Sequence, residues 1–321
     1  MSGPVSTGMT AVVPCFNEAD NVEHAYREIV TELGDHDLEV LFVDDGSSDG
    51  TLEKVRALAR TDPRVQYLSF TRNFGFEAAF SAGYRYASRP WILHIDADVQ
   101  FPVAEAHKLV AAAETGQDAV FGVRETRHDP LVRRVGARFY HFVARRVLGI
   151  EIPPGATTFR LVRAELARTI VDLRLGTPYF LATVPRLTNR YSTVPVAHRA
   201  RQRGGSKLHF RWLVGHAMGL FVGFSNRMAT AASLLALFAA VVAGLGAVGA
   251  AVGLLGTDVV ATVVLGTLLA VLTVLAVSVR HLVAVGAGQA RPALFYVREA
   301  TMPVDPADRL MTERIGEEVR S

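Results

Sequence analysis

Two carboxylates and a side-chain amide follow one apolar run of the sequence. Asp96, Asp98 and Gln100 come directly after residues 91–95, which have the composition of a buried parallel strand. Residues two apart in extended backbone point to the same side, so we expect the three side chains to converge. Hard divalent cations prefer oxygen ligands, so the pattern predicts a Mg²⁺ or Mn²⁺ site made of Asp96, Asp98 and Gln100. The alternative is a solvated acidic turn after a strand.

A second pair of acids, Asp44 and Asp45, follows the apolar run 38–43. Acids at the end of an early strand are suited to accept hydrogen bonds from a ribose or a base N–H. No Gly-x-Gly-x-x-Gly follows a strand, and no Gly-x-x-x-x-Gly-Lys is present. The sequence therefore disfavours dinucleotide and P-loop sites. A nucleotide diphosphate would need a cation and side chains to neutralise it.

The elements that must position these acids alternate along the chain. Strands are expected over 10–14, 38–43, 65–70 and 91–95, and helices over the stretch ending near residue 33, over 52–59 and over 76–87. This alternation predicts an α/β fold whose mostly parallel sheet has helices on both faces. The polar residues that follow each strand then gather along one edge of the sheet.

Basic residues dominate the region from 120 to 210. Arg124 ends another expected strand, and a helical stretch after it carries Arg133, Arg134, Arg138, Arg145 and Arg146. These arginines form either a solvated helix face or an anion site at a membrane surface. Arg201, Ser206 and Lys207 surround two glycines, a composition suited to binding phosphate. The alternative there is a flexible basic loop before a membrane segment.

Four motifs, in this order and spacing, resemble glycosyltransferase family 2. They occupy residues 13–18, 43–51, 72–75 and 96–100, and the resemblance is narrowest to polyprenyl-phosphate and dolichyl-phosphate sugar synthases. It implies a GT-A fold, a nucleotide-diphosphate-sugar donor and an inverting transfer. The implied donor-binding residues are Pro14, Asn17, Glu18, Asp44, Asp45, Arg72, Asp96 and Ala97. The implied catalytic residues are Asp96, Asp98, Arg201, Ser206 and Lys207, and those for an acceptor phosphate are Arg124, Arg134 and Arg201.

Three positions depart from the pattern of the family. Phe76 stands where many relatives have Lys, Thr158 stands where many have Asp before Phe-Arg-Leu, and His198 stands where Arg is common. These departures leave the donor and the acceptor undetermined, whereas the expected metal site is unaffected.

The apolar residues are concentrated late in the chain. Residues 228–256 and 259–279 carry no charge, and each stretch exceeds the roughly 20 residues that cross a bilayer core. Basic residues flank this pair of stretches and the short connection between them has none, so we expect two transmembrane helices with both termini in the cytoplasm. The start of the chain has no signal-peptide pattern, and the lone Cys15 allows no internal disulfide.

The predicted order is a cytoplasmic GT-A domain (1–207), an amphipathic interfacial segment (208–227), two membrane helices (228–282) and a cytoplasmic tail (283–321) whose residues 294–299 form a short strand. The hypothesis is metal-dependent transfer of a sugar from a UDP- or GDP-sugar to a polyprenyl phosphate at the cytoplasmic face of the inner membrane. One alternative is a hydroxyl acceptor, with Asp96, Glu77 or His198 as the base; another is a non-catalytic envelope scaffold. Nucleic acid is not an expected partner, and glycines near residue 246 allow a homo-oligomer.

Overall fold

The structure is a computed structural model that describes residues 8–125, 142, 146, 151–173, 180–199, 226–253, 256–289 and 294–309. The described residues form two compact units. The first unit holds the described residues up to 125, from 152 to 199 and from 294 to 309. The second unit contains two long helices from the apolar part of the chain.

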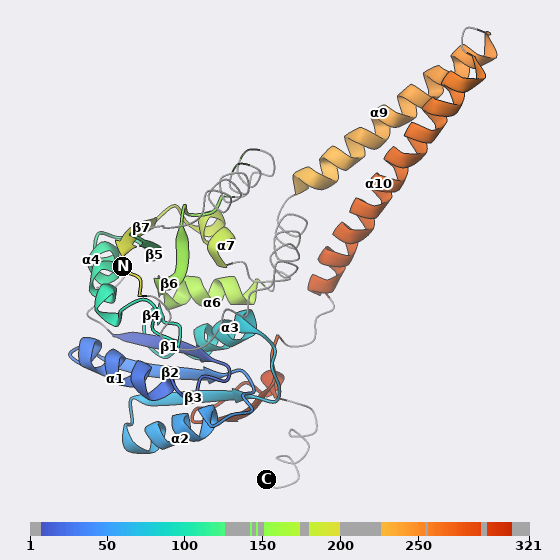
Figure 1. Ribbon diagram of the computed structural model, residues 1–321. Coiled ribbons are helices and arrows are strands. Elements are labelled where there is room, and N and C mark those ends of the chain that lie inside the picture. The colour runs from blue at the N-terminus through green and yellow to red at the C-terminus, as the bar shows by residue number, and fades with distance from the viewer. Residues whose placement is uncertain are drawn as a thin grey trace. The chain divides into compact units, whose positions relative to one another are not determined.

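The first unit is built on one eight-stranded sheet in the order β7-β5-β6-β4-β1-β2-β3-β8 (Figure 1). Only β6 and β8 run antiparallel to their neighbours, so the expectation of an α/β fold with a mostly parallel sheet is confirmed. The strands are β1 Met9–Cys15, β2 Leu38–Asp44, β3 Val65–Phe70, β4 Trp91–His94, β5 Ala119–Arg124, β6 Ala156–Arg163, β7 Tyr191–Val196 and β8 Val297–Ala300.

Helices cover both faces of this sheet because the central strands are apolar on both sides. Val13 of β1 packs into the cluster with α1 (Val22–Leu33), α2 (Thr51–Thr61), the short turn η2 (Val103–Glu105) and α4 (Ala106–Glu114). Val12 packs on the opposite face with α3 (Phe76–Tyr86), α6 (Ala164–Asp172) and α7 (Phe180–Leu187). The close approach of α3 requires Gly83, since a Cβ there would lie 2.3 Å from Val12 Cγ1.

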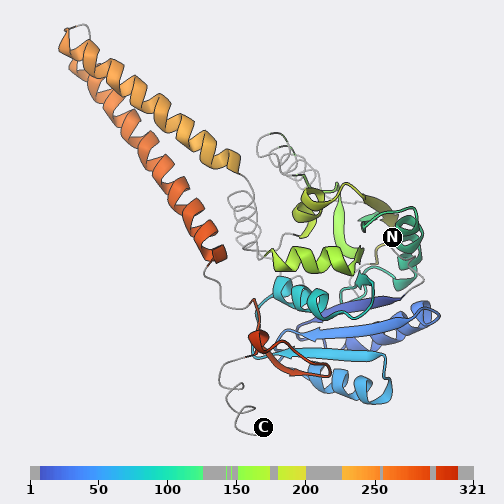
Figure 2. The same ribbon diagram turned by 180° about the vertical axis from the view of Figure 1, so that it is seen from behind.

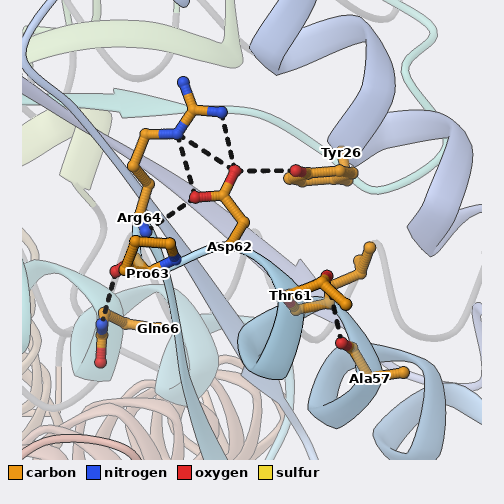
Figure 3. A network of polar contacts seen from close by, with 8 residues as sticks. Tyr26, Ala57, Thr61, Asp62, Pro63, Arg64 and Gln66 are labelled. Atoms are coloured by element: carbon orange, nitrogen blue, oxygen red, sulfur yellow. Dashed lines mark hydrogen bonds and ion pairs between the residues drawn. The ribbon is translucent and has the colours of Figure 1, made fainter.

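A network around Asp62 fixes the helices of one face (Figure 3). Asp62 follows α2 and accepts hydrogen bonds from Tyr26 Oη of α1 at 2.8 Å and from Arg64 Nη2 at 2.7 Å. The Arg64 bonds hold the pKa of Asp62 down at about 2 although burial opposes this. The network joins the second turn of α1 to the C-terminal end of α2, just before β3 begins.

The chain returns to the first unit after its apolar part. β8 pairs with β3, and the segment ends in a short 3₁₀ helix, η4 (Pro306–Asp308). Glu299 accepts from Arg56 and Tyr67, Asp308 accepts from Arg85 and Tyr86, and Phe295 stacks on Phe70 at 5.1 Å. The strand expected at 294–299 thus lies at 297–300, at the edge of the sheet.

The second unit contains two long helices, α9 (Asn226–Ala251) and α10 (Thr257–Gln289) (Figures 1 and 2). The two helices pack side by side, and Gly246 makes room for Val263, whose Cγ1 would lie 3.1 Å from a Cβ at that glycine. Among the described residues one helix segment, Asp258–Ala276 of α10, is long and apolar enough to cross a membrane, and a shorter apolar segment spans Leu234–Ala250. The expected domain boundary at 207 and most of the expected interfacial segment 208–227 lie outside the described residues.

Candidate active site

The polar residues singled out by the sequence gather where parallel strands end. Asp44, Asp96 and Arg124 follow or end β2, β4 and β5, and His198 follows β7. Since these four strands run in the same direction, their carboxyl ends lie along one edge of the sheet.

A tight turn, not extended backbone, carries Asp96, Asp98 and Gln100. β4 ends at His94, and Val99 N donates to Asp96 O at 3.0 Å. Val99 has φ +47°, a left-handed conformation that a β-branched side chain rarely adopts. Asp96 and Asp98 therefore lie in one strained turn, and such strain is typical of functional sites.

Gln100 links Asp98 to His198. Gln100 Nε2 donates to Asp98 Oδ2 at 2.7 Å, and Gln100 Oε1 lies 3.1 Å from His198 Nε2. Burial and the charge of Arg124 lower the pKa of His198, so the imidazole is neutral and Nε2 is the donor in this contact. In this arrangement the amide nitrogen of Gln100, not its oxygen, faces the carboxylate, and direct ligation of a cation would need the amide to turn over.

Asp96 faces two protein side chains that can donate to it. Thr158 Oγ1 of β6 donates to Asp96 Oδ2 at 2.6 Å, and His94 Nε2 lies 3.5 Å from Asp96 Oδ1. Burial raises the pKa of Asp96, but these contacts and the charge of Arg160 outweigh it and leave the pKa below its ordinary value. Asp96 is therefore an ionised acceptor whose side chain remains about one third exposed, at 32%.

A buried row of polar groups lies behind Asp96. His94 Nδ1 is 2.9 Å from Tyr84 Oη, and Arg160 Nε donates to the same oxygen at 2.6 Å. His94 and Tyr84 are fully buried and Arg160 is 3% exposed. Burial lowers the pKa of His94 to about 4 and raises that of Tyr84 to about 12, so both are neutral.

Hydrogen bonds connect the residues that are expected to bind the nucleotide. Asn17, in a left-handed conformation at φ +53°, accepts from Ser48 N at 2.9 Å, and its own N–H donates to Ser47 Oγ at 3.0 Å. Glu18 N donates to Thr51 Oγ1 at 2.9 Å. Asp44 is fully buried and accepts from Ser69 Oγ at 2.8 Å and from Ser47 N at 3.1 Å. The loops after β1 and β2 thus form one rigid surface.

Asp45 organises the loop that follows β3. Its carboxylate accepts from Phe74 N at 2.6 Å and from Gly75 N at 2.9 Å, while its own N–H donates to Cys15 O at 2.9 Å. Gly46 is obligatory beside it, because φ is +66° and a Cβ would lie 2.4 Å from the carbonyl carbon of Arg72. Burial raises the pKa of Asp45 to about 6 despite the two backbone donors.

The remaining expected residues differ in how far the structure places them. Pro14 is buried in β1, Ala97 is buried in the turn after β4, and the exposed Arg72 lies over the ring of Phe74 at 4.0 Å. Arg124 lies over the Phe101 ring at 5.8 Å, close to His198. Four expected residues lie outside the described part of the chain: Arg134, Arg201, Ser206 and Lys207.

Sequence reasoning missed His94, Tyr84 and Arg160 as neighbours of the site. His94 was included only as part of a strand, and Arg160 only as part of the Phe-Arg-Leu motif. The available signal was their chemistry, because His and Arg are rare inside an apolar strand unless they are paired.

The carboxylates fit a divalent cation bound together with a diphosphate. No group of three or more His, Cys, Asp and Glu suited to a metal occurs among the described residues. Mg²⁺ and Mn²⁺ do not need such a cage, since sites that handle phosphates use one or two carboxylates and complete the coordination with phosphate oxygens and water. The ionised and partly exposed Asp96, with Asp98 in the same turn, meets that requirement.

Comparison with known proteins agrees with this fold. Residues 10–171 match the family described as Glycosyl transferase family 2. The chain is 30% identical over 68% of its length to an uncharacterized glycosyltransferase of Synechocystis, covering 69% of that protein. It is 32% identical over 64% of each chain to an undecaprenyl-phosphate 4-deoxy-4-formamido-L-arabinose transferase of Salmonella choleraesuis.

The solved structure of glucosyl-3-phosphoglycerate synthase from Mycobacterium tuberculosis, with Mn²⁺, UDP and glucosyl-3-phosphoglycerate, superposes with a TM-score of 0.50. The match covers 69% of this chain and 80% of that one at 19% identity, and it shows a GT-A-like fold. The chain is thus a glycosyltransferase of the α/β class with a mostly parallel sheet. It belongs to glycosyl transferase family 2.

Proposed function

We propose that this protein transfers a sugar, with inversion, from a UDP- or GDP-sugar to a polyprenyl-type lipid phosphate at the cytoplasmic face of the membrane. The observation that carries the proposal is the turn after β4, where Asp96 and Asp98 lie at the edge of the sheet that also presents Asp44 and Arg124. Two similar proteins support the lipid-phosphate acceptor, the metal and the donor. The Salmonella relative is an undecaprenyl-phosphate sugar transferase, and the mycobacterial structure is described with Mn²⁺ and UDP.

The roles follow from the charges at this edge. Asp96, Asp98 and, after the amide turns, Gln100 would hold Mg²⁺ or Mn²⁺, which neutralises the diphosphate as it leaves. Asn17, Glu18, Asp44, Asp45 and neighbouring residues would hold the nucleoside. Arg124, with Arg134, Arg201, Ser206 and Lys207, would bind the acceptor phosphate and share the charge of the diphosphate.

A phosphate acceptor suits a site in which neither Thr158 nor Asp96 serves as a strong base. Thr158 stands where many relatives have Asp, and its hydroxyl donates to Asp96. Asp96 itself has a lowered pKa and faces two donors, so it accepts a proton poorly. A phosphate monoester is already anionic near neutral pH and attacks without deprotonation.

One observation favours a second candidate, a hydroxyl acceptor. The neutral His198 directs Nε2 at Gln100, so its Nδ1 carries a lone pair that can accept a proton. With a hydroxyl acceptor, this imidazole is the base that the geometry favours among the three candidates, Asp96, Glu77 and His198.

The position of β8 supports two membrane crossings rather than one. β8 pairs with β3, so residues 297–300 lie on the same side of any membrane as the catalytic sheet. Between β7 and β8 the chain must therefore cross an even number of times. If α10 spans the membrane, α9 is the described partner for the second crossing, and its 26 residues extend about 39 Å, more than the roughly 30 Å of a bilayer core.

Transfer from labelled UDP- and GDP-sugars to a short polyprenyl phosphate, with Mn²⁺ or Mg²⁺, tests the proposal. We expect one donor to give a lipid product, and Asp98→Ala to lower its rate at least about 100-fold. The matched control is Asp172→Ala, which removes an exposed carboxylate on α6 and leaves the rate unchanged. Donor binding without product on any lipid phosphate contradicts the proposal. In that case, product on a hydroxyl acceptor that is lost in His198→Ala establishes the second candidate.

A further inference from the structure

The row of buried polar groups behind Asp96 has a fixed direction. Arg160 Nε can only donate, so Tyr84 Oη accepts from it at 2.6 Å. The single hydrogen of Tyr84 is then free for His94 Nδ1 at 2.9 Å. A neutral imidazole that accepts at Nδ1 carries its hydrogen on Nε2, and Nε2 faces Asp96 Oδ1 at 3.5 Å. Every hydrogen in the row therefore points toward Asp96.

The hydrogen on His94 Nε2 has few possible acceptors around it. Its side chain is fully buried, and among the described residues Nε2 has no partner at hydrogen-bond distance. The rings of Phe76, Phe80 and Tyr84 lie around the imidazole, with centroids 5.5, 5.9 and 5.9 Å away. Asp96 is the acceptor that the structure places in front of the buried N–H.

Arg160 is a costly residue to bury for stability alone. It is 3% exposed, and its Nη2 has no hydrogen-bond partner among the described residues. The guanidinium lies 4.2 Å from the centre of the Phe180 ring and 5.0 Å from that of Phe80, and these aromatic faces offset only part of the cost. The nearest compensation along the row is the charge of Asp96, whose pKa Arg160 helps to lower.

We propose that Arg160, Tyr84 and His94 form a directed relay, made of two hydrogen bonds and the 3.5 Å approach of His94 Nε2 to Asp96 Oδ1, that positions Asp96 for the divalent cation and so determines how tightly the site binds it. The inference rests on the proposed function, since it assigns Asp96 to the metal site. The three residues are positioning residues, because each would act on the cation only through Asp96. Thr158 supports Asp96 from the other side by donating to Oδ2. Groups behind the ligands of a metal orient those ligands, and their loss typically weakens metal binding 10–100-fold.

The test is Mn²⁺ binding to the full-length protein in detergent, followed by electron paramagnetic resonance with UDP or GDP present and no sugar transfer. Tyr84→Phe removes the hydroxyl and keeps the ring, and we expect Mn²⁺ to bind about 10–100-fold more weakly. Tyr26→Phe is the matched control, because it removes a tyrosine hydroxyl bonded to Asp62 on the other face of the sheet. The control leaves Mn²⁺ binding unchanged.

Variants at Arg160 and His94 distinguish a role in metal binding from a role in folding. Arg160→Met removes a buried charge in exchange for an apolar side chain, so the unfolding temperature stays level or rises while Mn²⁺ binding weakens. His94→Gln keeps an acceptor and a donor in one side chain and retains more Mn²⁺ binding than His94→Leu. A fall in stability with unchanged Mn²⁺ affinity in Tyr84→Phe and Arg160→Met overturns the relay.

Asp98→Ala distinguishes failure of the relay from failure of the proposed function. Where Asp98→Ala abolishes Mn²⁺ binding and Tyr84→Phe does not affect it, the relay is wrong and the proposed function stands. Where the unmodified protein binds no Mn²⁺ with either nucleotide, the metal-dependent function and the relay fail together.

Discussion

Asp45 is an acid whose ionised form the folded chain disfavours. Burial raises its pKa to about 6 in the folded protein, whereas an unfolded chain has a pKa near 3.9 for Asp. Between these values the unfolded state has released the proton that the folded state still holds. Stability contributed by Asp45 is therefore present at low pH and is lost as the pH rises through about 6.

The predicted size of this loss from pH 5 to pH 7 is about 1 kcal/mol. Asp45→Asn does not titrate, so the difference in unfolding free energy between the unmodified protein and this variant should change by that amount over the same range. Denaturation in detergent at several pH values measures it. The raised pKa is contradicted if the difference in unfolding free energy does not change with pH, or if the unmodified protein gains stability relative to Asp45→Asn as the pH rises.

At the scale of single residues the sequence predicted the acids at one edge of the sheet but not the groups that support them. Asp44, Asp45, Asp96 and Asp98 were found because acids that follow strands are visible in a pattern. The relay behind Asp96 was not, because Tyr84, His94 and Arg160 come from α3, β4 and β6, and only the packed sheet brings them together. The positive φ of Val99 is a second feature without a signal, since nothing about valine indicates it.

At the scale of elements, β8 and the turn after it are held by two similar contacts in different surroundings. Asp308 is 5% exposed and accepts from Arg85 and Tyr86, whereas Glu299 is 33% exposed and accepts from Arg56 and Tyr67. Neutralising the buried Asp308 leaves Arg85 only the exposed Asp172, at 3.4 Å, whereas the partly exposed pair of Glu299 and Arg56 is solvated.

We therefore expect Asp308→Asn to destabilise the first unit by about 2 kcal/mol and Glu299→Gln by less than about 1 kcal/mol. Thermal unfolding in detergent measures both, and each variant serves as the control for the other. Equal losses would show that burial does not set the strength of the two contacts.

The sequence predicted six of the eight strands of the sheet and missed β6 and β7. The first four strands follow the alternation of strand and helix, and their ranges differ from the expected ones by a few residues at most. The insertion of β6, antiparallel, between β4 and β5 was not predicted. Strand order depends on long-range pairing, and an apolar run carries no direction.

At the scale of the whole molecule, the pairing of β8 with β3 requires the chain between β7 and β8 to cross any membrane an even number of times. The connection between α9 and α10 lies across the membrane from the catalytic sheet if both helices span it, and on the same side if α9 does not. The protein suits cysteine labelling, because its one native cysteine, Cys15, is 2% exposed in β1.

Gly256→Cys and Ala307→Cys place a thiol at exposed positions in the connection and in the segment after β8. In intact spheroplasts a membrane-impermeant maleimide should label Gly256→Cys at once, and should label Ala307→Cys only after the membrane is opened. The unmodified protein, which has only Cys15, sets the background. Labelling of Gly256→Cys only after opening would mean that α9 does not cross, and because β8 must remain with β3, α10 would then not cross alone either. The apolar pair would in that case lie along the membrane or against another chain, and the two-span proposal would be wrong.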